Sequence, residues 1–234
     1  MDITGSVALV TGANRGIGRR FAQQLLERGA AKVYATSRRP ELVDVPGVEV
    51  LQLDITDPAS VAAAAAAAGD VTLLVNNAGL TTRTNLLSGE LADIRLEMET
   101  HYFGTLGVVR AFAPVLGRNG GGAIANVLSA LSWFSSDGAN AYAAAKAAEW
   151  SLTNGIRLEL TDQGTLVTGV VLGAADTEMM AAYTGPMLDP ADVARAALDG
   201  VQAGAWEVLV DDTSRHVKAA LAVDPQEFYR PQAG

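Results

Sequence analysis

The chain of 234 residues has 17 Lys and Arg against 26 Asp and Glu, and this net charge of −9 argues against nucleic-acid binding as its main task. It has no Cys, which excludes disulfides, thiol nucleophiles and Cys-based metal sites, and we predict no metal site. The N-terminus lacks a basic region followed by a long apolar stretch, and no apolar run reaches the roughly 18 residues of a membrane span. We therefore expect a cytoplasmic protein that does not enter the membrane.

The first part of the chain alternates short β-branched runs with segments of helical periodicity. Helices are predicted at 17–28, which Gly29 ends, and after Thr56 or Asp57, with Pro58 in the first turn. The second of these helices contains the run from Ala62 to Ala68, because Ala is the strongest helix former. Strands are predicted at 7–10, 32–36, 48–53 and 71–75.

The second part continues the alternation and completes the predicted fold. Helices are predicted at 90–116, 140–160, 177–183 and 190–203, and strands at 123–128, 166–172 and 206–210, followed by a polar and apolar tail. Strict alternation implies right-handed βαβ units, so we predict an α/β fold with a doubly wound parallel sheet and helices on both faces. Because no Pro- or Ser-rich linker interrupts the pattern, we predict one domain over residues 1–234.

A glycine-rich loop, residues 11–18, lies between the first predicted strand and the first predicted helix. Its sequence is Thr-Gly-Ala-Asn-Arg-Gly-Ile-Gly. Glycines let the backbone turn sharply and approach a pyrophosphate, and the helix start offers free N–H donors to its charge. A merely tight turn is the alternative, but the position between a strand and a helix favours a dinucleotide site.

The end of the second strand predicts which dinucleotide is bound. An acidic side chain there binds the 2′-hydroxyl of NAD, whereas a basic one accommodates the 2′-phosphate of NADP. This chain has Ser37, Arg38 and Arg39 and no acid, and Arg15 lies in the glycine loop. Arg forms bidentate contacts with phosphate, although one of Arg38 and Arg39 can equally be solvated surface charge. We predict NADP(H), with Ser37 and Arg38 as contacts.

Three groups can move a proton to or from a carbonyl oxygen. Tyr142 and Lys146 lie four residues apart in an Ala-rich segment, so a helix projects both from one face. An ammonium beside a phenol, whose reference pKa is about 10, favours the phenolate and makes the tyrosine a usable acid or base. Ser129 lies upstream, where the fold can bring its hydroxyl to the same carbonyl. Considered alone, the pair is better explained by a Tyr packed against a Lys stem, so the catalytic interpretation depends on the other motifs.

Taken together, these motifs resemble the short-chain dehydrogenase/reductase family over nearly the whole chain, and its NADP-preferring carbonyl reductases in particular. The family's adenine-contacting aspartate corresponds to Asp54, followed by Ile55, and its Asn-Asn-Ala-Gly stretch to residues 76–79. Its serine lies thirteen residues before the tyrosine, as Ser129 lies before Tyr142.

The resemblance implies a Rossmann-type sheet of seven strands and hydride transfer between a nicotinamide and a carbonyl or alcohol carbon. In it, Tyr142 is the proton donor, Lys146 binds the nicotinamide ribose and depresses the tyrosine pKa, and Ser129 holds the substrate oxygen. Thr177 is expected to contact the carboxamide. The predicted cofactor-binding residues are Gly12, Asn14, Arg15, Gly16, Ile17, Gly18, Ser37, Arg38, Asp54, Ile55, Asn77, Ala78, Gly79, Tyr142, Lys146, Gly173 and Thr177.

Two positions depart from the family pattern. His101 stands where the family commonly has Asn, whose backbone carbonyl holds a water in a proton relay to the lysine. A backbone role survives this change, an imidazole can also join the relay, or His101 is only a tolerated helix residue. Leu172 stands where the family has Pro before Gly173, which implies a less constrained loop that still binds the cofactor.

The substrate is expected to be a small carbonyl compound or alcohol, and a hydrophobic or aryl one. The apolar residues after Ser129 and in the covering segment suit such a molecule, and neither stretch contains Arg or Lys to bind a charged group. The residues concerned are Leu131, Trp133, Phe134, Met179, Met180, Tyr183 and Met187. The alternative is that several of them, Trp133 above all, belong to the core or to a subunit interface. The family assembles through its two long helices, so a homodimer or homotetramer is expected. Two alternatives stay open: a non-catalytic NADP(H)-sensing regulator, and a dehydrogenase for a sugar or steroid alcohol.

Overall fold

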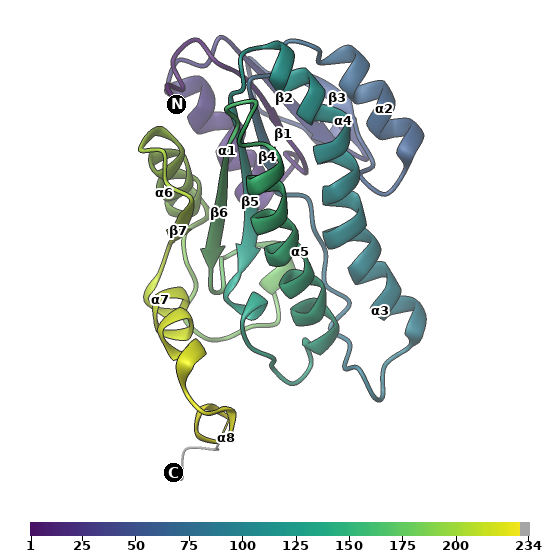
Figure 1. Ribbon diagram of the computed structural model, residues 1–234. Coiled ribbons are helices and arrows are strands. Elements are labelled where there is room, and N and C mark those ends of the chain that lie inside the picture. Colours follow the sequence, from purple (N-terminus) through teal and green to yellow (C-terminus); the bar gives the residue numbers. More distant parts are fainter. Residues whose placement is uncertain (230–234) are drawn as a thin grey trace.

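A computed structural model describes residues 1–229, and its centre is a sheet of seven parallel strands in the order β3-β2-β1-β4-β5-β6-β7 (Figure 1). The strand order reverses between β1 and β4, which is where α/β sheets of this type open a crevice at the carboxyl ends of their strands. The predicted doubly wound fold with seven strands is confirmed. The strands are β1 (Val7–Val10), β2 (Lys32–Ser37), β3 (Glu49–Gln52), β4 (Leu73–Asn76), β5 (Ala123–Ser129), β6 (Leu166–Leu172) and β7 (Glu207–Leu209).

Helices cover both faces of the sheet and form a hydrophobic core on each (Figure 1). One core joins the sheet to α1 and α6, around Phe21 and Leu198, and the other joins it to α2, α4 and α5, around Phe112. Asp57 caps α2 through a hydrogen bond from the Ala59 N–H, as predicted for this start. The helices are α1 (Gly16–Glu27), α2 (Pro58–Ala67), α3 (Leu91–Met98), α4 (Thr105–Arg118), α5 (Asn140–Glu159), α6 (Pro190–Gln202), α7 (Asp212–Ala219) and α8 (Pro225–Phe228). Among the residues described, no helix combines the length and apolarity that crossing a membrane requires.

Two predicted helices differ from the structure. The predicted helix 90–116 consists of α3, a π-helical segment Glu99–Gly104, and α4. Gly104 is tightly packed here, since an added Cβ would lie 3.0 Å from Ile55 atoms. A widened turn depends on such contacts and leaves no trace in hydrophobic periodicity. The predicted helix 177–183 is only the 3₁₀ turn Glu178–Met180, because the hydrogen bond from the Asp176 N–H to the Leu188 carbonyl ties the segment into a loop.

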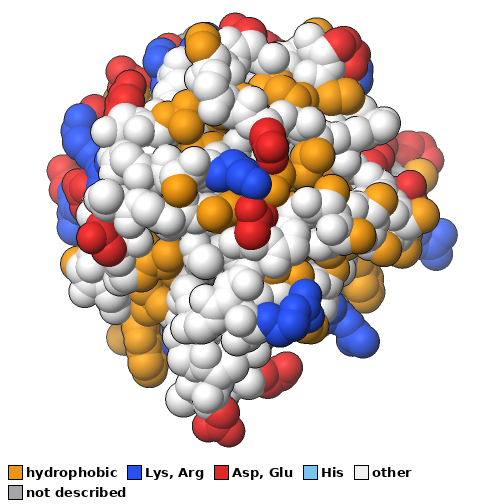
Figure 2. All heavy atoms as spheres, turned by 90° about the horizontal axis from the view of Figure 1, so that it is seen from above, with side chains coloured by type: hydrophobic (Ala, Val, Ile, Leu, Met, Phe, Trp, Pro, Cys, Tyr) orange, Lys and Arg blue, Asp and Glu red, His pale blue; other side chains and the backbone are white. Residues whose placement is uncertain are grey.

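The amino-terminal end of the sheet, opposite the crevice, carries acidic and basic side chains next to one another rather than a patch of one sign (Figure 2). Lys32 at the start of β2 illustrates the pattern. Its ammonium is 2.8 Å from Asp70 and 3.1 Å from the Tyr34 hydroxyl, and the pKa of Lys32 is raised chiefly by the hydrogen bond to Asp70. Such mixed surface charge offers no footprint for a polyanion at this end.

Candidate active site

A cavity of about 670 Å³ opens at the carboxyl ends of the strands and spans the point where the strand order reverses. It brings together the glycine loop, the ends of β2, β4, β5 and β6, and the start of α5. Every residue predicted to bind the cofactor lines this cavity except Gly18, and Ser129 lines it too. These lining residues are Gly12, Asn14, Arg15, Gly16, Ile17, Ser37, Arg38, Asp54, Ile55, Asn77, Ala78, Gly79, Tyr142, Lys146, Gly173 and Thr177.

The glycine loop has the geometry of an anion cradle. Gly12 and Gly16 have φ of 66° and 53°, a region that favours glycine, and they place the backbone at the cavity wall. Arg15, the N-cap of α1, makes no side-chain cap, and no acidic residue lies in the first turn. The first N–H groups of α1 are therefore left for an anion, with the helix dipole favouring it.

Gly18 lies behind this cradle and acts through packing. A Cβ at this position would lie 2.1 Å from the Gly12 carbonyl oxygen and 2.5 Å from Asn77 Nδ2. Asn77 Nδ2 itself donates to the Thr11 carbonyl at 3.0 Å, and the N–H groups of Asn77 and Ala78 donate to Thr11 Oγ1. The Asn-Asn-Ala-Gly stretch thus holds the glycine loop in place, and only a glycine at 18 lets the two approach.

The basic end of the cavity lies at the end of β2. Ser37 is buried and accepts a hydrogen bond from the Arg39 N–H, while Arg38 and Arg39 are exposed and both line the cavity. Arg15 forms an ion pair with Glu178 in the covering segment, which the sequence analysis did not anticipate. No acidic residue stands in this part of β2.

The residue predicted to contact the adenine, Asp54, lies just after β3. Its Oδ1 accepts hydrogen bonds from the Thr56 N–H at 3.0 Å and from Thr56 Oγ1 at 2.7 Å, so the carboxylate is held at the cavity edge.

Ser129, Tyr142 and Lys146 meet at the other end of the cavity. Ser129 is the last residue of β5, and its Oγ accepts a hydrogen bond from the Leu131 N–H at 3.1 Å. Tyr142 and Lys146 lie on the first turns of α5, with the Lys146 ammonium 5.9 Å from the centre of the tyrosine ring. The helix periodicity accounts for the tyrosine and lysine sharing a face, and the parallel register of β5 and β6 places Ser129 beside Leu172.

The environment of Tyr142 differs from the sequence expectation. Burial raises the pKa of Tyr142, and the charges of Glu149 and Glu97 raise it further, while Lys146 and a hydrogen bond with Ser129 lower it. Lys146 acts in the expected direction, but the expectation of a lowered phenol pKa is wrong, because burial of the phenol outweighs the ammonium and the charges of Glu149 and Glu97 add to the effect of burial. Both carboxylates come from helix residues that the sequence analysis did not single out.

His101 is part of this buried cluster rather than a permissive helix position. It lies in the π-helical segment, and its side chain is 1% exposed. Nε2 is 2.8 Å from the Leu80 carbonyl and 3.3 Å from Glu97 Oε2, and the ring meets that of Tyr142 edge-on at 5.1 Å. The ring also packs on Gly79, where an added Cβ would lie 2.7 Å from Cε1.

A covering segment after β6 lies over the glycine loop. Thr177 packs on Gly16, with its Cγ2 3.0 Å from where a Cβ would stand, and the Arg83 guanidinium donates to the Met179 carbonyl at 2.9 Å. Asp211 accepts a hydrogen bond from the Gly173 N–H at 3.1 Å and also caps α7, so it restrains the turn that lacks the family's Pro. The Asp-x-x-Ser spacing of residues 211–214 is the sequence signal for that cap.

The apolar wall is narrower than expected. Leu131, Phe134, Met179, Met180 and Tyr183 line the cavity, but Trp133 and Met187 do not. Trp133 is instead half-buried, meets Trp150 edge-on at 6.3 Å, and lies under Lys218, where it lines a small separate pocket beside α7 and α8. Arg83, which the sequence analysis overlooked because it lies far from both stretches in the chain, also lines the cavity and has φ of 54°.

Comparison with known proteins agrees with this arrangement. A model of the short chain dehydrogenase family matches residues 6–186. A short chain dehydrogenase from Burkholderia cenocepacia J2315, solved in complex with NADP, is similar with a TM-score of 0.93 and 41% identity over 97% of each chain.

Two curated relatives are oxidoreductases by name. A 3-oxoacyl-[acyl-carrier-protein] reductase of Vibrio cholerae serotype O1 is 37% identical over 193 residues, 76% of this chain and 77% of that protein. An uncharacterized oxidoreductase of Staphylococcus aureus strain MW2 is 30% identical over 214 residues, 84% of this chain and 90% of that protein. With the parallel sheet, the glycine loop and the family match over residues 6–186, the chain belongs to the short-chain dehydrogenase/reductase family and is an oxidoreductase of that family.

Proposed function

We propose that the protein reduces a ketone or aldehyde to the alcohol with NADPH, and runs in reverse as an alcohol dehydrogenase. The observation that carries this proposal is one cavity with a phosphate cradle at one end and Ser129, Tyr142 and Lys146 at the other. The residues present fit NADP(H): Gly12 and Gly16 leave room for a pyrophosphate, the start of α1 is uncapped, and Ser37 and Arg38 suit a 2′-phosphate. Support also comes from the 41% identical neighbour, which was solved with NADP.

The cofactor supplies the hydride that forms the new C–H bond at the carbonyl carbon, and the protein supplies the proton. Ser129 Oγ orients the carbonyl by donating a hydrogen bond to its oxygen. Tyr142 Oη donates its proton to the same oxygen as the C=O π bond breaks, which yields the alcohol and a phenolate. Burial raises the pKa of Tyr142, so the phenol is protonated at neutral pH before the carbonyl compound binds, and its proton is available for transfer. Lys146 stabilises the phenolate until a proton returns to it.

We propose a hydrophobic or aryl carbonyl compound as the substrate. The apolar side chains of Leu131, Phe134 and Met180 line the catalytic end of the cavity and support this choice. Arg83 lines the same cavity, and the Vibrio cholerae relative is named for an acyl-carrier substrate, so charged carbonyl compounds belong in the test.

The proposal is tested by NADPH consumption with a panel of aryl ketones, alkyl ketones, 2-keto acids and a 3-oxoacyl thioester, with NADH in parallel. Turnover of uncharged ketones with NADPH far above NADH is the expected result. Preference for the keto acids or the thioester would contradict the substrate class. Equal or better use of NADH would contradict the choice of NADP(H).

Replacing Arg38 by Ala is expected to weaken NADPH binding by roughly 10- to 100-fold and to leave NADH binding nearly unchanged. A hydrogen bond to a charged group is worth about 1.5–3 kcal/mol, and about 1.4 kcal/mol corresponds to tenfold in affinity. Calorimetric titration of both dinucleotides measures the effect. Arg20→Ala is the matched control, because Arg20 is an exposed arginine of α1 bonded only to Gln23 in the described residues. Weaker NADPH binding in Arg39→Ala, with unchanged binding in Arg38→Ala, would assign the 2′-phosphate contact to Arg39 instead of Arg38.

We further propose assembly as a homodimer or homotetramer through α3, α4 and α5. Two large apolar side chains in this region are solvent-accessible in the single chain: Leu96 on α3 is 43% exposed, and Phe103 in the π-helical segment between α3 and α4 is 51% exposed. Burying them against a second copy is favourable. Light scattering during gel filtration tests this, and Phe103→Glu is expected to shift the population toward monomer.

A further inference from the structure

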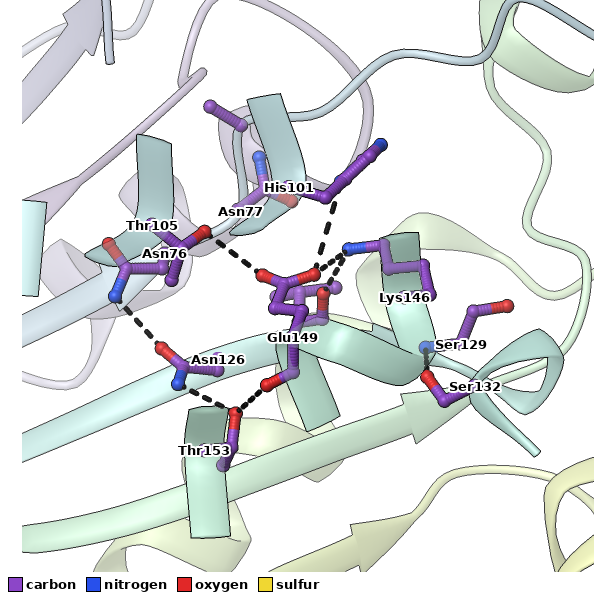
Figure 3. Close-up of polar contacts among 12 residues, drawn as sticks. Asn76, Asn77, His101, Thr105, Asn126, Ser129, Ser132, Lys146, Glu149 and Thr153 are labelled. Carbon is purple, nitrogen blue, oxygen red and sulfur yellow. Dashed lines mark hydrogen bonds and ion pairs between the residues drawn. The ribbon is translucent and has the colours of Figure 1, made fainter. Parts of the chain in front are cut away.

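A buried carboxylate lies directly against the lysine of the site. Glu149 is one helical turn after Lys146 on α5, and its side chain is 2% exposed. Its Oε2 is 2.6 Å from Lys146 Nζ (Figure 3). A buried ion pair at this distance controls where the ammonium sits, because neither charge has water as an alternative partner.

Hydrogen bonds hold both the carboxylate and the backbone of Glu149. Its Oε1 accepts a hydrogen bond from Thr105 Oγ1 on α4 at 3.1 Å. The Glu149 backbone carbonyl accepts from Thr153 Oγ1 at 2.8 Å, and Thr153 in turn accepts from Asn126 on β5 at 2.9 Å. Asn76 on β4 donates to Asn126 at 2.8 Å and completes a polar chain that Figure 3 shows running from the sheet to α5. Glu149 is therefore held relative to the sheet that carries Ser129.

The contacts of Lys146 leave one donor for the cavity. A lysine ammonium has three N–H donors. One bonds to Glu149 and a second to the Val127 carbonyl at 2.8 Å. The remaining N–H is the one that can reach a bound dinucleotide, so Glu149 and Val127 determine its direction.

The charge of Glu149 also acts on Tyr142. The titratable groups next to Glu149 are Lys146 on α5 and His101 in the π-helical segment, whose Nδ1 is 3.9 Å from Glu149 Oε2. On the other side of the His101 ring lies Glu97 of α3, and the charges of both carboxylates act on Tyr142. Burial works to lower the pKa of Lys146, and the charge of Glu149 does most to raise it above its ordinary value. The same negative charge raises the pKa of Tyr142. An ammonium paired with a carboxylate thus stabilises a nearby phenolate less than a free ammonium does.

We propose that Glu149 is a positioning residue that orients Lys146 and, by its negative charge, holds Tyr142 in the acid form that carbonyl reduction requires. That the reaction is carbonyl reduction rests on the proposed function. The effects of the Glu149 charge on Lys146 and Tyr142 do not, since they concern only groups of the chain itself. Alcohol oxidation needs the tyrosine as a base, so the pair Lys146–Glu149 biases the site toward reduction.

The test is an ultraviolet difference titration of Tyr142, taken as each protein minus its Tyr142→Phe counterpart, with neither substrate nor cofactor. Glu149→Gln keeps the shape of the side chain and removes its charge. It is expected to let Tyr142 ionise at lower pH than in the unmodified protein, by on the order of half a pH unit or more. Glu149→Asp retains the charge and is expected to stay near the unmodified protein. Coincident titrations for Glu149→Gln and the unmodified protein would overturn the proposal.

The variant Thr153→Val distinguishes a purely structural role of Glu149 from an effect of its charge. It removes a buried hydrogen bond to the Glu149 backbone without changing any charge. This variant is expected to melt at lower temperature and to leave the Tyr142 titration in place. A shift as large as that of Glu149→Gln would show that loosened packing, not charge, moves the tyrosine.

A second comparison applies if Glu149→Gln does not fold because Lys146 is left unpaired. Lys146→Gln is then compared with the double variant Lys146→Gln/Glu149→Gln, and Tyr142 is expected to ionise at higher pH in the single variant, which keeps the Glu149 charge. Equal values would again overturn the proposal.

Turnover distinguishes this proposal from the proposed function. In Glu149→Gln, kcat/KM for alcohol oxidation is expected to begin rising at a lower pH than in the unmodified protein. The kcat/KM for carbonyl reduction is likewise expected to begin falling at a lower pH. A shifted titration with no turnover of any carbonyl compound would contradict the function and retain the role of Glu149. Turnover of a carbonyl compound together with an unshifted Tyr142 titration would support the proposed function and contradict the role of Glu149.

Discussion

Replacing Tyr142 by Phe is expected to lower carbonyl reduction by about 10²–10⁴-fold, the usual contribution of a positioned general acid, while NADPH still binds. The phenol oxygen is the only atom group removed, and the ring that meets His101 edge-on at 5.1 Å is retained. The proton source at the carbonyl oxygen is thereby lost without a cavity. Initial rates with NADPH, measured beside the dissociation constant of NADPH, test both parts of the expectation.

Tyr34→Phe is the matched control for this change. The Tyr34 hydroxyl bonds to Asp70 and Lys32 at the opposite end of the sheet, so its loss is expected to affect stability and not turnover. Unchanged turnover in Tyr142→Phe would contradict the assignment of the proton donor. A protein that binds NADPH but turns over no carbonyl compound in either form would favour the NADP(H)-sensing regulator.

Replacing Gly18 by Ala is expected to lower the free energy of unfolding by about 1–3 kcal/mol, the range for forcing an extra methyl group into a packed site. The added Cβ would stand 2.1 Å from the Gly12 carbonyl oxygen, so the glycine loop or α1 has to move. Because we propose that Gly12 and Gly16 form the phosphate cradle, we expect NADPH affinity to fall by at least about tenfold as well, which corresponds to about 1.4 kcal/mol. Urea unfolding and NADPH titration measure the two effects.

Gly107→Ala provides the control on the other side of the molecule. Gly107 lies within α4, and an added Cβ meets nothing within 4 Å. Ala is favoured over Gly inside a helix by about 0.5–1 kcal/mol, so this variant is expected to be more stable and to bind NADPH normally. Equal stability of Gly18→Ala and the unmodified protein would show that the loop accommodates the methyl group and that Gly18 is not essential to the cradle.

The sequence by itself determined the fold and the location of the site. Alternating β-branched runs and helical segments specify a parallel sheet. The apolar face of each strand and helix is visible as a short, local pattern in the sequence, and packing helices on the sheet is what buries these faces. The glycine spacing of residues 11–18 and the four-residue spacing of Tyr142 and Lys146 are equally local, since both express backbone conformation within one loop or one helix. The carboxyl ends of parallel strands meet at one edge, which brings these motifs together.

The tertiary structure decided what surrounds those groups. The burial that raises the pKa of Tyr142 most, and the charges of Glu149 and Glu97 that raise it further, act there only because α3, the π-helical segment and α5 pack together. The sequence does carry Lys146 and Glu149 three residues apart, but such a pair on a helix is ordinary surface charge unless the fold buries it. Arg83 lines the cavity and Trp133 does not for the same reason, because contacts between segments distant in the chain decide which side chains face the cavity. Periodicity records how each element is patterned, whereas burial and charge depend on which elements meet.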